Sequence, residues 1–212
     1  MSDLDERKTK NRRIIVEQSS QLLFPWKRCR DGYEIREDEE GAPWFHPLSA
    51  NSEEIEPLED TALFRRFADL DAADPEAILG FIKDNGLDSD ALEPDPLGLW
   101  QVAIGSMRDG VNAWLRGDVD SLAVRFNELN MGAVHLRLAP QPWHSPPILY
   151  IEPSSLFLAL WAQLAHAASH SLTQRQCDFC RRWYSPQTKR SKFCDTPCRT
   201  ANKYYQDKEQ GK

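Results

Sequence analysis

The sequence predicts an α+β protein that is mainly α-helical, with a short β-hairpin in its body and a small cysteine-rich module at its C-terminal end. Apolar residues recur at helical spacing through most of residues 60–129 and again after residue 155. Between these stretches, around residues 134–151, apolar and polar residues alternate as they do in strands. Four of the five cysteines lie between residues 177 and 198. We therefore expect a helix-rich acidic domain over residues 1–172 and a second domain over residues 173–212.

The N-terminal part of the chain has the weakest periodic pattern. Residues 12–23 are predicted to form a helix with a small apolar face. Residues 31–60 hold eleven acids and three prolines without a 3.6-residue period, so we expect a long acidic connection with one short strand at residues 33–35. Cys29 has no partner cysteine near it in the sequence; its basic neighbours could lower its pKa, and a plain thiol is the simpler interpretation.

Helices are predicted from residue 60 onward. Asp74-Pro75-Glu76 supplies an N-cap, a first-turn proline and a first-turn acid for a helix that ends at Asn85-Gly86. The longest helix follows, and its apolar stripe is expected to be core rather than the wall of a ligand pocket. Gly117-Asp118 ends that helix and begins another. The predicted buried residues of these helices are Leu63, Phe64, Phe67, Leu97, Trp100, Ile104, Met107, Val111, Trp114, Leu115, Leu122, Val124, Phe126 and Leu129.

Two short strands are predicted next, at residues 134–138 and 148–151, paired as a hairpin across residues 140–147. A final body helix is expected from Ser155 to about Leu172. Its longest apolar run, residues 156–162, is far shorter than the ~18 residues of a membrane span. No apolar signal core follows the charged first residues. We therefore expect a soluble, cytoplasmic protein that makes no contact with a membrane.

The charge of the chain changes sign where the cysteines begin. The 212 residues carry a net charge of −7, of which residues 1–172 contribute −13 and residues 173–212 contribute +6. This balance excludes a protein that coats nucleic acid with its whole surface. It is compatible with a small basic module attached to an acidic body.

The cysteines are spaced Cys177-x2-Cys180-x13-Cys194-x3-Cys198. Two such pairs are typical of a tetrahedral zinc site. Thr196-Pro197 indicates a helix start between the second pair, so the module is expected to be a knuckle, a hairpin and a helix, in a treble-clef-like or ribbon-like zinc finger. Phe179, Trp183 and Phe193 are expected to form its small core. Four thiolates leave no position for water, so we expect one structural Zn2+ and no catalytic residue.

The residues around these cysteines resemble the CGNR-type zinc finger of bacterial proteins. The matching segments are Arg175-Gln176-Cys177-Asp178-Phe179-Cys180, Trp183-Tyr184, Lys192-Phe193-Cys194 and Cys198-Arg199. In that family a helical, ligand-sensing-like domain called ABATE precedes the finger, and the body of this chain is similar to it in layout. The resemblance implies a role in stress-linked transcription regulation. The family has Cys-Gly-Asn-Arg and a basic helix at the last ligand, where this chain has Cys198-Arg199-Thr200-Ala201.

Two functions remain open from the residues. The finger either contacts DNA or RNA through basic side chains, or docks a homodimer partner or another protein. An enzyme is not expected: His166 and His170 lie four residues apart without the adjacent glutamate of a zinc protease, and are read as exposed histidines. The candidate nucleic-acid contacts are Arg181, Arg182, Lys189, Arg190, Lys192, Arg199 and Lys203.

Overall fold

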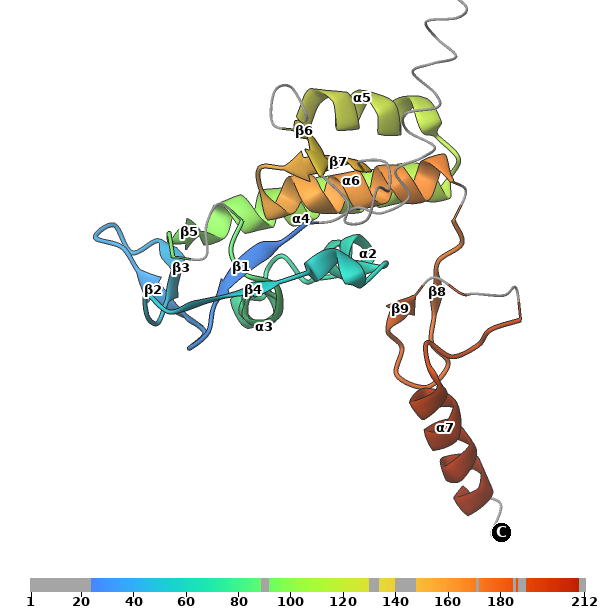
Figure 1. Cartoon of the computed structure of the whole chain (residues 1–212). Helices are drawn as coiled ribbons and strands as arrows, with labels where there is room; N and C mark the ends of the chain where they lie inside the picture. Colours follow the sequence, from blue (N-terminus) through green and yellow to red (C-terminus); the bar gives the residue numbers. More distant parts are fainter. Residues whose placement is uncertain are drawn as a thin grey trace, which may run out of the picture.

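The computed structural model describes residues 24–88, 92–129, 134–139, 148–170, 172–184, 186 and 190–209. A body of helices and small sheets is followed by a separate C-terminal module that ends in helix α7 (Figure 1). The helix predicted for residues 12–23, the connection 140–147 and Lys189 lie outside the described residues. No described helix is long and apolar enough to cross a membrane.

The segment predicted as a long connection with one short strand is instead built around several β-strands; the strand predicted at residues 33–35 forms as part of β2, and the prediction of a connection for the rest was wrong. It contains β1 (Trp26–Cys29), β2 (Tyr33–Glu37), β3 (Pro43–Pro47) and β4 (Ser52–Ile55). β2 and β3 pair antiparallel between the paired β1 and β4, so the four strands follow one another as a nested hairpin. A further short strand, β5 (Asp95–Pro96), pairs with β3. These strands are mostly half-exposed and stabilised by pairing with one another, so they carry little of the periodic signal that sequence analysis detects.

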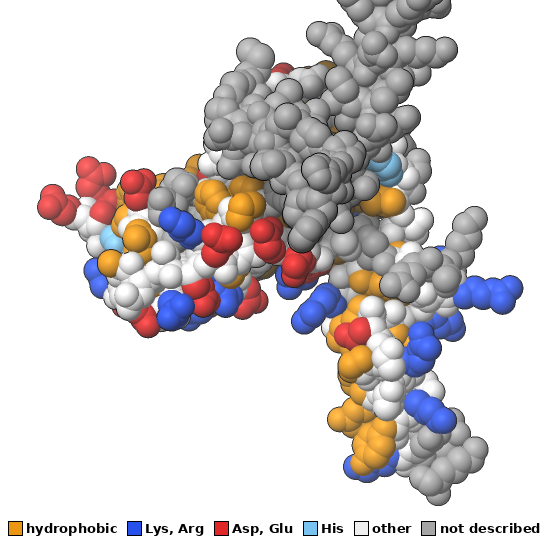
Figure 2. Space-filling model, in the orientation of Figure 1, with side chains coloured by type: hydrophobic (Ala, Val, Ile, Leu, Met, Phe, Trp, Pro, Cys, Tyr) orange, Lys and Arg blue, Asp and Glu red, His pale blue; other side chains and the backbone are white. Residues whose placement is uncertain are grey.

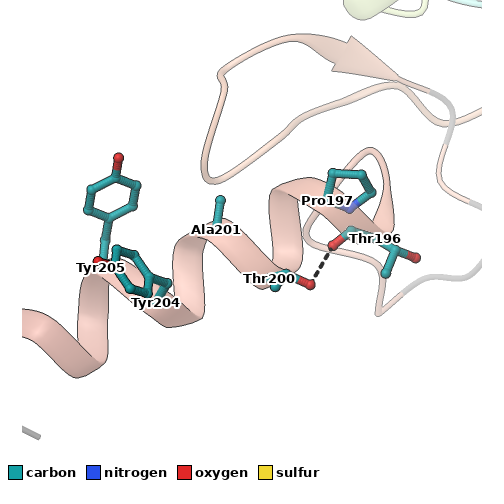
Figure 3. Close-up of a pocket in the computed structure, with 6 residues that line it drawn as sticks. All are labelled: Thr196, Pro197, Thr200, Ala201, Tyr204 and Tyr205. Atoms are coloured by element: carbon teal, nitrogen blue, oxygen red, sulfur yellow. Dashed lines mark hydrogen bonds between the residues drawn. The ribbon is translucent and has the colours of Figure 1, made fainter.

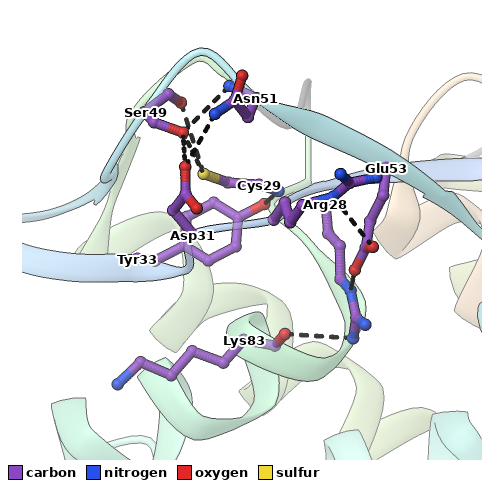
Figure 4. Close-up of polar contacts among 9 residues, drawn as sticks. Arg28, Cys29, Asp31, Tyr33, Ser49, Asn51, Glu53 and Lys83 are labelled. Atoms are coloured by element: carbon purple, nitrogen blue, oxygen red, sulfur yellow. Dashed lines mark hydrogen bonds and ion pairs between the residues drawn. The ribbon is translucent and has the colours of Figure 1, made fainter.

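Polar contacts hold the bend between the two strand pairs (Figure 4). The carboxylate of Asp31 accepts hydrogen bonds from Ser49 Oγ and from Asn51 Nδ2, the latter at 3.1 Å. The Cys29 amide donates to the Tyr33 hydroxyl at 2.6 Å, and the Cys29 thiol is buried with its Sγ 3.5 Å from the Ser49 carbonyl oxygen. Burial raises the pKa of Cys29, but hydrogen bonds, chiefly from Ser49, outweigh it and lower the pKa. The thiol therefore belongs to the bend and not to a separate site.

The predicted helices form. They are α2 (Leu63–Ala68), α3 (Pro75–Asn85), α4 (Leu97–Leu115), α5 (Val119–Leu129) and α6 (Leu156–Ser169), with a 3-10 turn η1 (Pro57–Glu59) before α2. Asp74 caps α3 as predicted, because its side chain accepts from the amides of Glu76 and Ala77. Gly86 ends that helix at φ +87°, where a Cβ would lie 2.6 Å from the Lys27 carbonyl oxygen on β1.

The core lies between the hairpin and helices α2, α3, α4 and α6. Trp100 is fully buried at its centre, and its ring meets those of Phe45, Phe67, Phe81 and Phe157 at steep angles. Such edge-to-face contacts are favourable for aromatic rings. Trp100 is therefore core, as predicted, and not the wall of a pocket.

Some predicted core positions are wrong. Trp114 is only half-buried, against Phe64, while Leu115 is 61% exposed and Val124 is 55% exposed. They lie at the edge of the packed face or on the opposite one, because a helix buries only the stripe that meets a neighbour. Helix α6 ends at Ser169, three residues before the predicted end.

Gln163 performs a task that the sequence did not reveal. Helix α2 has no side-chain cap of its own, and the buried Gln163 of α6 accepts a hydrogen bond from the Phe64 amide at 3.0 Å. Its Nε2 donates to the Asp60 carbonyl oxygen at 2.8 Å. One amide side chain thus satisfies a donor at the start of α2 and an acceptor in the preceding turn.

The predicted second hairpin is confirmed in its pairing. Strands β6 (Val134–Ala139) and β7 (Ile148–Pro153) are antiparallel, with Val134 opposite Pro153 and Ala139 opposite Ile148.

Candidate metal centre

The C-terminal module contains the predicted knuckle and helix, but its hairpin encloses the knuckle instead of following it as predicted. Strands β8 (Arg175–Gln176) and β9 (Trp183–Tyr184) pair antiparallel, and α7 runs from Thr196 to Glu209. Between the strands the chain makes a tight turn in which the Arg181 amide donates to the Cys177 carbonyl oxygen at 3.0 Å. Arg181 has φ +61°, a left-handed conformation that closes the knuckle.

The second cysteine pair is placed by the start of α7. Asp195 caps the helix, since its carboxylate accepts from the Cys198 amide at 2.7 Å. Cys194 therefore lies immediately before the cap and Cys198 in the first turn. The loop between the pairs is fastened by the Asp178 amide, which donates to the Lys192 carbonyl oxygen at 3.0 Å, and by the Tyr184 hydroxyl, which donates to Ser191 O at 2.7 Å.

The four sulfurs of Cys177, Cys180, Cys194 and Cys198 all lie within 4.8 Å of one another. Two of the separations are 3.5 Å, between Cys194 and Cys198, and 3.7 Å, between Cys180 and Cys194. A tetrahedron with metal–sulfur bonds of ~2.3 Å has sulfur–sulfur edges of ~3.8 Å, whereas a disulfide needs ~2.05 Å. The four cysteines are therefore positioned to bind one metal ion.

The electrostatics of the cluster also favour a cation. Burial raises the pKa of Cys177, but backbone hydrogen bonds from Cys180, Cys194 and Phe179 outweigh it and lower the pKa to about 6. For Cys194, burial raises the pKa most; Cys180 and Cys177 also raise it, and although the hydrogen bond with Cys198 lowers it, the pKa is about 11. The thiolate of Cys177 thus forms readily, and any further thiolate formed beside it is repelled by its negative charge. A divalent cation removes this repulsion, because it binds all four sulfurs as thiolates.

Trp183 and Phe179 do not lie in a core of the module, and that prediction was wrong: Phe179 is 37% exposed, and Trp183 packs against the body. Its indole Nε1 donates to the Asp69 carboxylate at the end of α2, and the Arg65 guanidinium carbon lies 4.3 Å from the centre of its ring. Gln174 adds a hydrogen bond from its Nε2 to the Thr61 carbonyl oxygen at 3.3 Å. The hairpin of the finger is thus attached to the body. The sequence offered no signal for this, because an aromatic residue beside a cysteine pair is equally suited to a local core.

The basic side chains of the finger remain on its surface. Those described among the candidates are all exposed, and within the described part of the chain none of them makes an ion pair. In Figure 2 blue side chains gather along one side of the module and hydrophobic ones along the other. The exposed residues are Arg181, Arg182, Arg190, Lys192, Arg199 and Lys203.

The histidines of α6 form no second centre with a third ligand among the described residues. The rings of His166 and His170 lie 4.2 Å apart, and His170 is exposed as expected, whereas His166 is half-buried. Burial, and secondarily the charge of His170, lower the pKa of His166. The two rings are tilted by 32° against each other at the end of the helix.

Comparison with known proteins adds no assignment. The sequence matches no family model, and no curated protein matches it significantly. Any functional assignment must therefore be argued from the four-cysteine centre and the body that carries it.

Proposed function

We propose that this protein is a zinc-binding regulator of transcription whose finger contacts nucleic acid through its exposed basic side chains. We take the finger to be of the CGNR type that it resembles and the body to be an ABATE-like domain that senses a ligand. We place the protein in the cytoplasm. Zinc is proposed as the metal because four thiolates in a small module are its usual structural ligands. The observation that carries the nucleic-acid role is the set of six exposed cations on the finger without ion pairs among the described residues.

The charge of the loaded finger supports this role. Residues 173–212 carry +6 with neutral cysteines, and four thiolates with one Zn2+ together carry −2, which leaves +4. The body carries −13 and repels a polyanion. The finger projects away from the body in Figure 1, which separates the cationic surface from most of that charge. Phosphate neutralisation then supplies the affinity.

The test compares two triple variants of the full chain. Arg182, Arg190 and Lys192 are changed to Ala on the finger, and Lys27, Lys83 and Arg116, which are exposed on the body, are changed to Ala as the control. Both variants lose three positive charges. Each lost phosphate contact removes about 0.9 from the slope of log K against log salt. The finger variant should weaken duplex binding at every sequence and flatten the slope by about 2 to 3; equal effects of the two variants would contradict the proposal.

A protein-docking finger is the second candidate. It is favoured by the contact of Trp183 with Arg65 and Asp69, in which the hairpin of the finger packs on a protein surface of the same chain. In that case the finger binds a second copy or another protein, and the zinc has a purely structural role. Failure of the full chain to bind duplex or single strands at low salt would favour this candidate.

A further inference from the structure

The outer face of α7 carries two exposed tyrosines. Tyr204 is 63% exposed and Tyr205 is 54% exposed. A module of this size has few large side chains with which to build a core, yet these two rings remain at its surface. The two rings lie beside a shallow, open hollow on the helix surface (Figure 3). The hollow measures about 620 Å³ and is lined by Thr196, Pro197, Thr200, Ala201, Tyr204 and Tyr205.

The rings are held in a fixed arrangement. Phe179, from the zinc knuckle, is stacked on Tyr205 with ring centres 5.9 Å apart and planes 22° apart. The rings of Tyr204 and Tyr205 meet edge to face at 5.5 Å. The knuckle supplies Cys177 and Cys180 and the start of the helix supplies Cys194 and Cys198, so a metal ion bound by these cysteines would join the two elements that carry the rings. A preorganised aromatic surface loses little side-chain entropy when it binds a ligand.

Cations adjoin the rings along the same helix. Lys208 lies one turn beyond both rings, at i+4 from Tyr204 and i+3 from Tyr205, the spacings that place side chains on one face of a helix. Lys203 immediately precedes Tyr204 and lies on the adjacent side of the helix. Both lysines are exposed. The face therefore offers flat aromatic rings for stacking and, in Lys208, an ammonium group for phosphate within two turns of helix.

We propose that the face formed by Phe179, Tyr204 and Tyr205 binds unpaired nucleotides, of DNA or RNA, by stacking their bases, while Lys208 contacts an adjoining phosphate. This rests on the proposed nucleic-acid role and adds a site for single strands to the duplex contacts proposed for Arg182, Arg190 and Lys192. Stacking of bases on aromatic side chains is the main interaction of proteins that bind single strands. In a duplex the bases are already stacked on each other, so these rings gain nothing there without unstacking a step.

The alternative occupant, a second copy of the chain, fits the face less well. A stable interface buries about 800 Å² on each partner. Two turns of α7 with two tyrosines expose much less apolar surface than that.

The test uses the zinc-loaded full chain and three labelled probes at low salt: an oligothymidylate of about 15 nucleotides, an oligouridylate of the same length, and a duplex of matched length. Tyr204→Ala and the double variant Tyr204→Ala/Tyr205→Ala are compared with Tyr204→Phe/Tyr205→Phe, which keeps both rings. Zinc content and circular dichroism verify folding. Tyr204→Ala is the safer variant, because Tyr204 does not stack on the knuckle.

The alanine variants should weaken single-strand binding about tenfold or more, as expected for the loss of a stacked base, and leave duplex affinity unchanged. The phenylalanine variant should bind nearly as the parent does. The two single-strand probes decide between DNA and RNA as the source of the nucleotides. Unchanged single-strand affinity in the alanine variants overturns this inference, and duplex binding that still depends on Arg182, Arg190 and Lys192 would then leave the proposed function standing. If no probe binds at all, both fail; if the alanine variants instead abolish self-association, the face is a contact between copies.

Discussion

Trp183 in the hairpin of the finger donates its indole N–H to the carboxylate of Asp69, which lies 114 residues earlier in the body. Arg65, one turn before Asp69 on α2, covers the face of the same indole with its guanidinium group at 4.3 Å. A cation over an aromatic face and a hydrogen bond to a charged acceptor are both favourable contacts. Among the described residues, Trp183 therefore contributes to the attachment of the finger to the body, as does Gln174 through its contact with Thr61.

Replacing Trp183 by Phe should release the finger from the body without removing its metal. Phenylalanine keeps a ring for Arg65 but cannot donate to Asp69, and a hydrogen bond to a charged group contributes about 1.5–3 kcal/mol. Trypsin should cleave the variant at Arg175 faster than it cleaves the parent protein, while the zinc content of the variant stays unchanged. Asp69→Asn should have a similar effect, and the double variant should add little to either single one. Additive effects would show that the two residues do not act as a pair.

The metal centre should hold one zinc ion per chain. Cys198→Ser should lose the ion and the helical signal of α7, because a module of this size has too little core to fold alone. Cys29→Ser is the matched control, since Cys29 is buried in the bend of the hairpin and lies outside the cluster. It should keep all of the zinc. Elemental analysis with circular dichroism before and after chelation measures both quantities; zinc retained in full by Cys198→Ser would contradict the assigned ligands.

Asp88 should make the stability of the body depend on pH. Burial raises the pKa of Asp88 to about 6, although its Oδ1 accepts a hydrogen bond from the Phe157 amide at 2.7 Å. A carboxyl group whose pKa is higher in the folded state than in the unfolded state stabilises the fold when it is protonated. This stabilisation is complete at pH values below the unfolded-state pKa and is lost as the pH rises through about 6. Asp88→Asn, which keeps an acceptor for Phe157, should therefore be more stable than the parent by about 2–3 kcal/mol at pH 7 and by little at pH 4.

Asp31→Asn serves as the control of opposite sign. Hydrogen bonds from Ser49 and Asn51 hold the pKa of Asp31 below its usual range, so its contribution is present at neutral pH and is lost as pH falls. This variant should be less stable than the parent at pH 7, with a difference that shrinks in acid. Urea melts of the three proteins at several pH values measure these differences. A difference between Asp88→Asn and the parent that does not change with pH would show that Asp88 is not protonated in the folded state.

Two glycines of α4 should respond oppositely to alanine. A Cβ at Gly110 would lie 2.5 Å from the ring of Trp161 on α6, whereas a Cβ at Gly105 would meet nothing within 4 Å. Both changes gain helix propensity, which alone stabilises by about 1 kcal/mol. Gly105→Ala should show that gain, and Gly110→Ala should lose about 1–3 kcal/mol through overpacking. Denaturant melts compare the two; equal stabilisation would mean that α4 and α6 are not in close contact at this point.

Several features followed from the sequence because they depend on residues that are neighbours in the chain. Asp74 caps α3 and Gly86 ends it through backbone contacts within a few residues. The cysteine spacing placed four sulfurs around one point, because each pair is brought together by its own turn or helix start. The pairing of β6 with β7 followed from alternation in two nearby segments. In each case the determining interaction is local, so the residue types alone predict it.

Only the tertiary structure decided the features that need partners distant in the chain. The strands of residues 26–55 are recognised by their pairing with one another, since their half-exposed residues lack a long apolar period. The exposure of Leu115 and Val124 depends on which helix face meets a neighbour. Gln163 finds its partners about a hundred residues away, and Trp183 finds Asp69 and Arg65 on the body. The side chains in these contacts are equally compatible with several surroundings, and packing of the whole chain selects one of them.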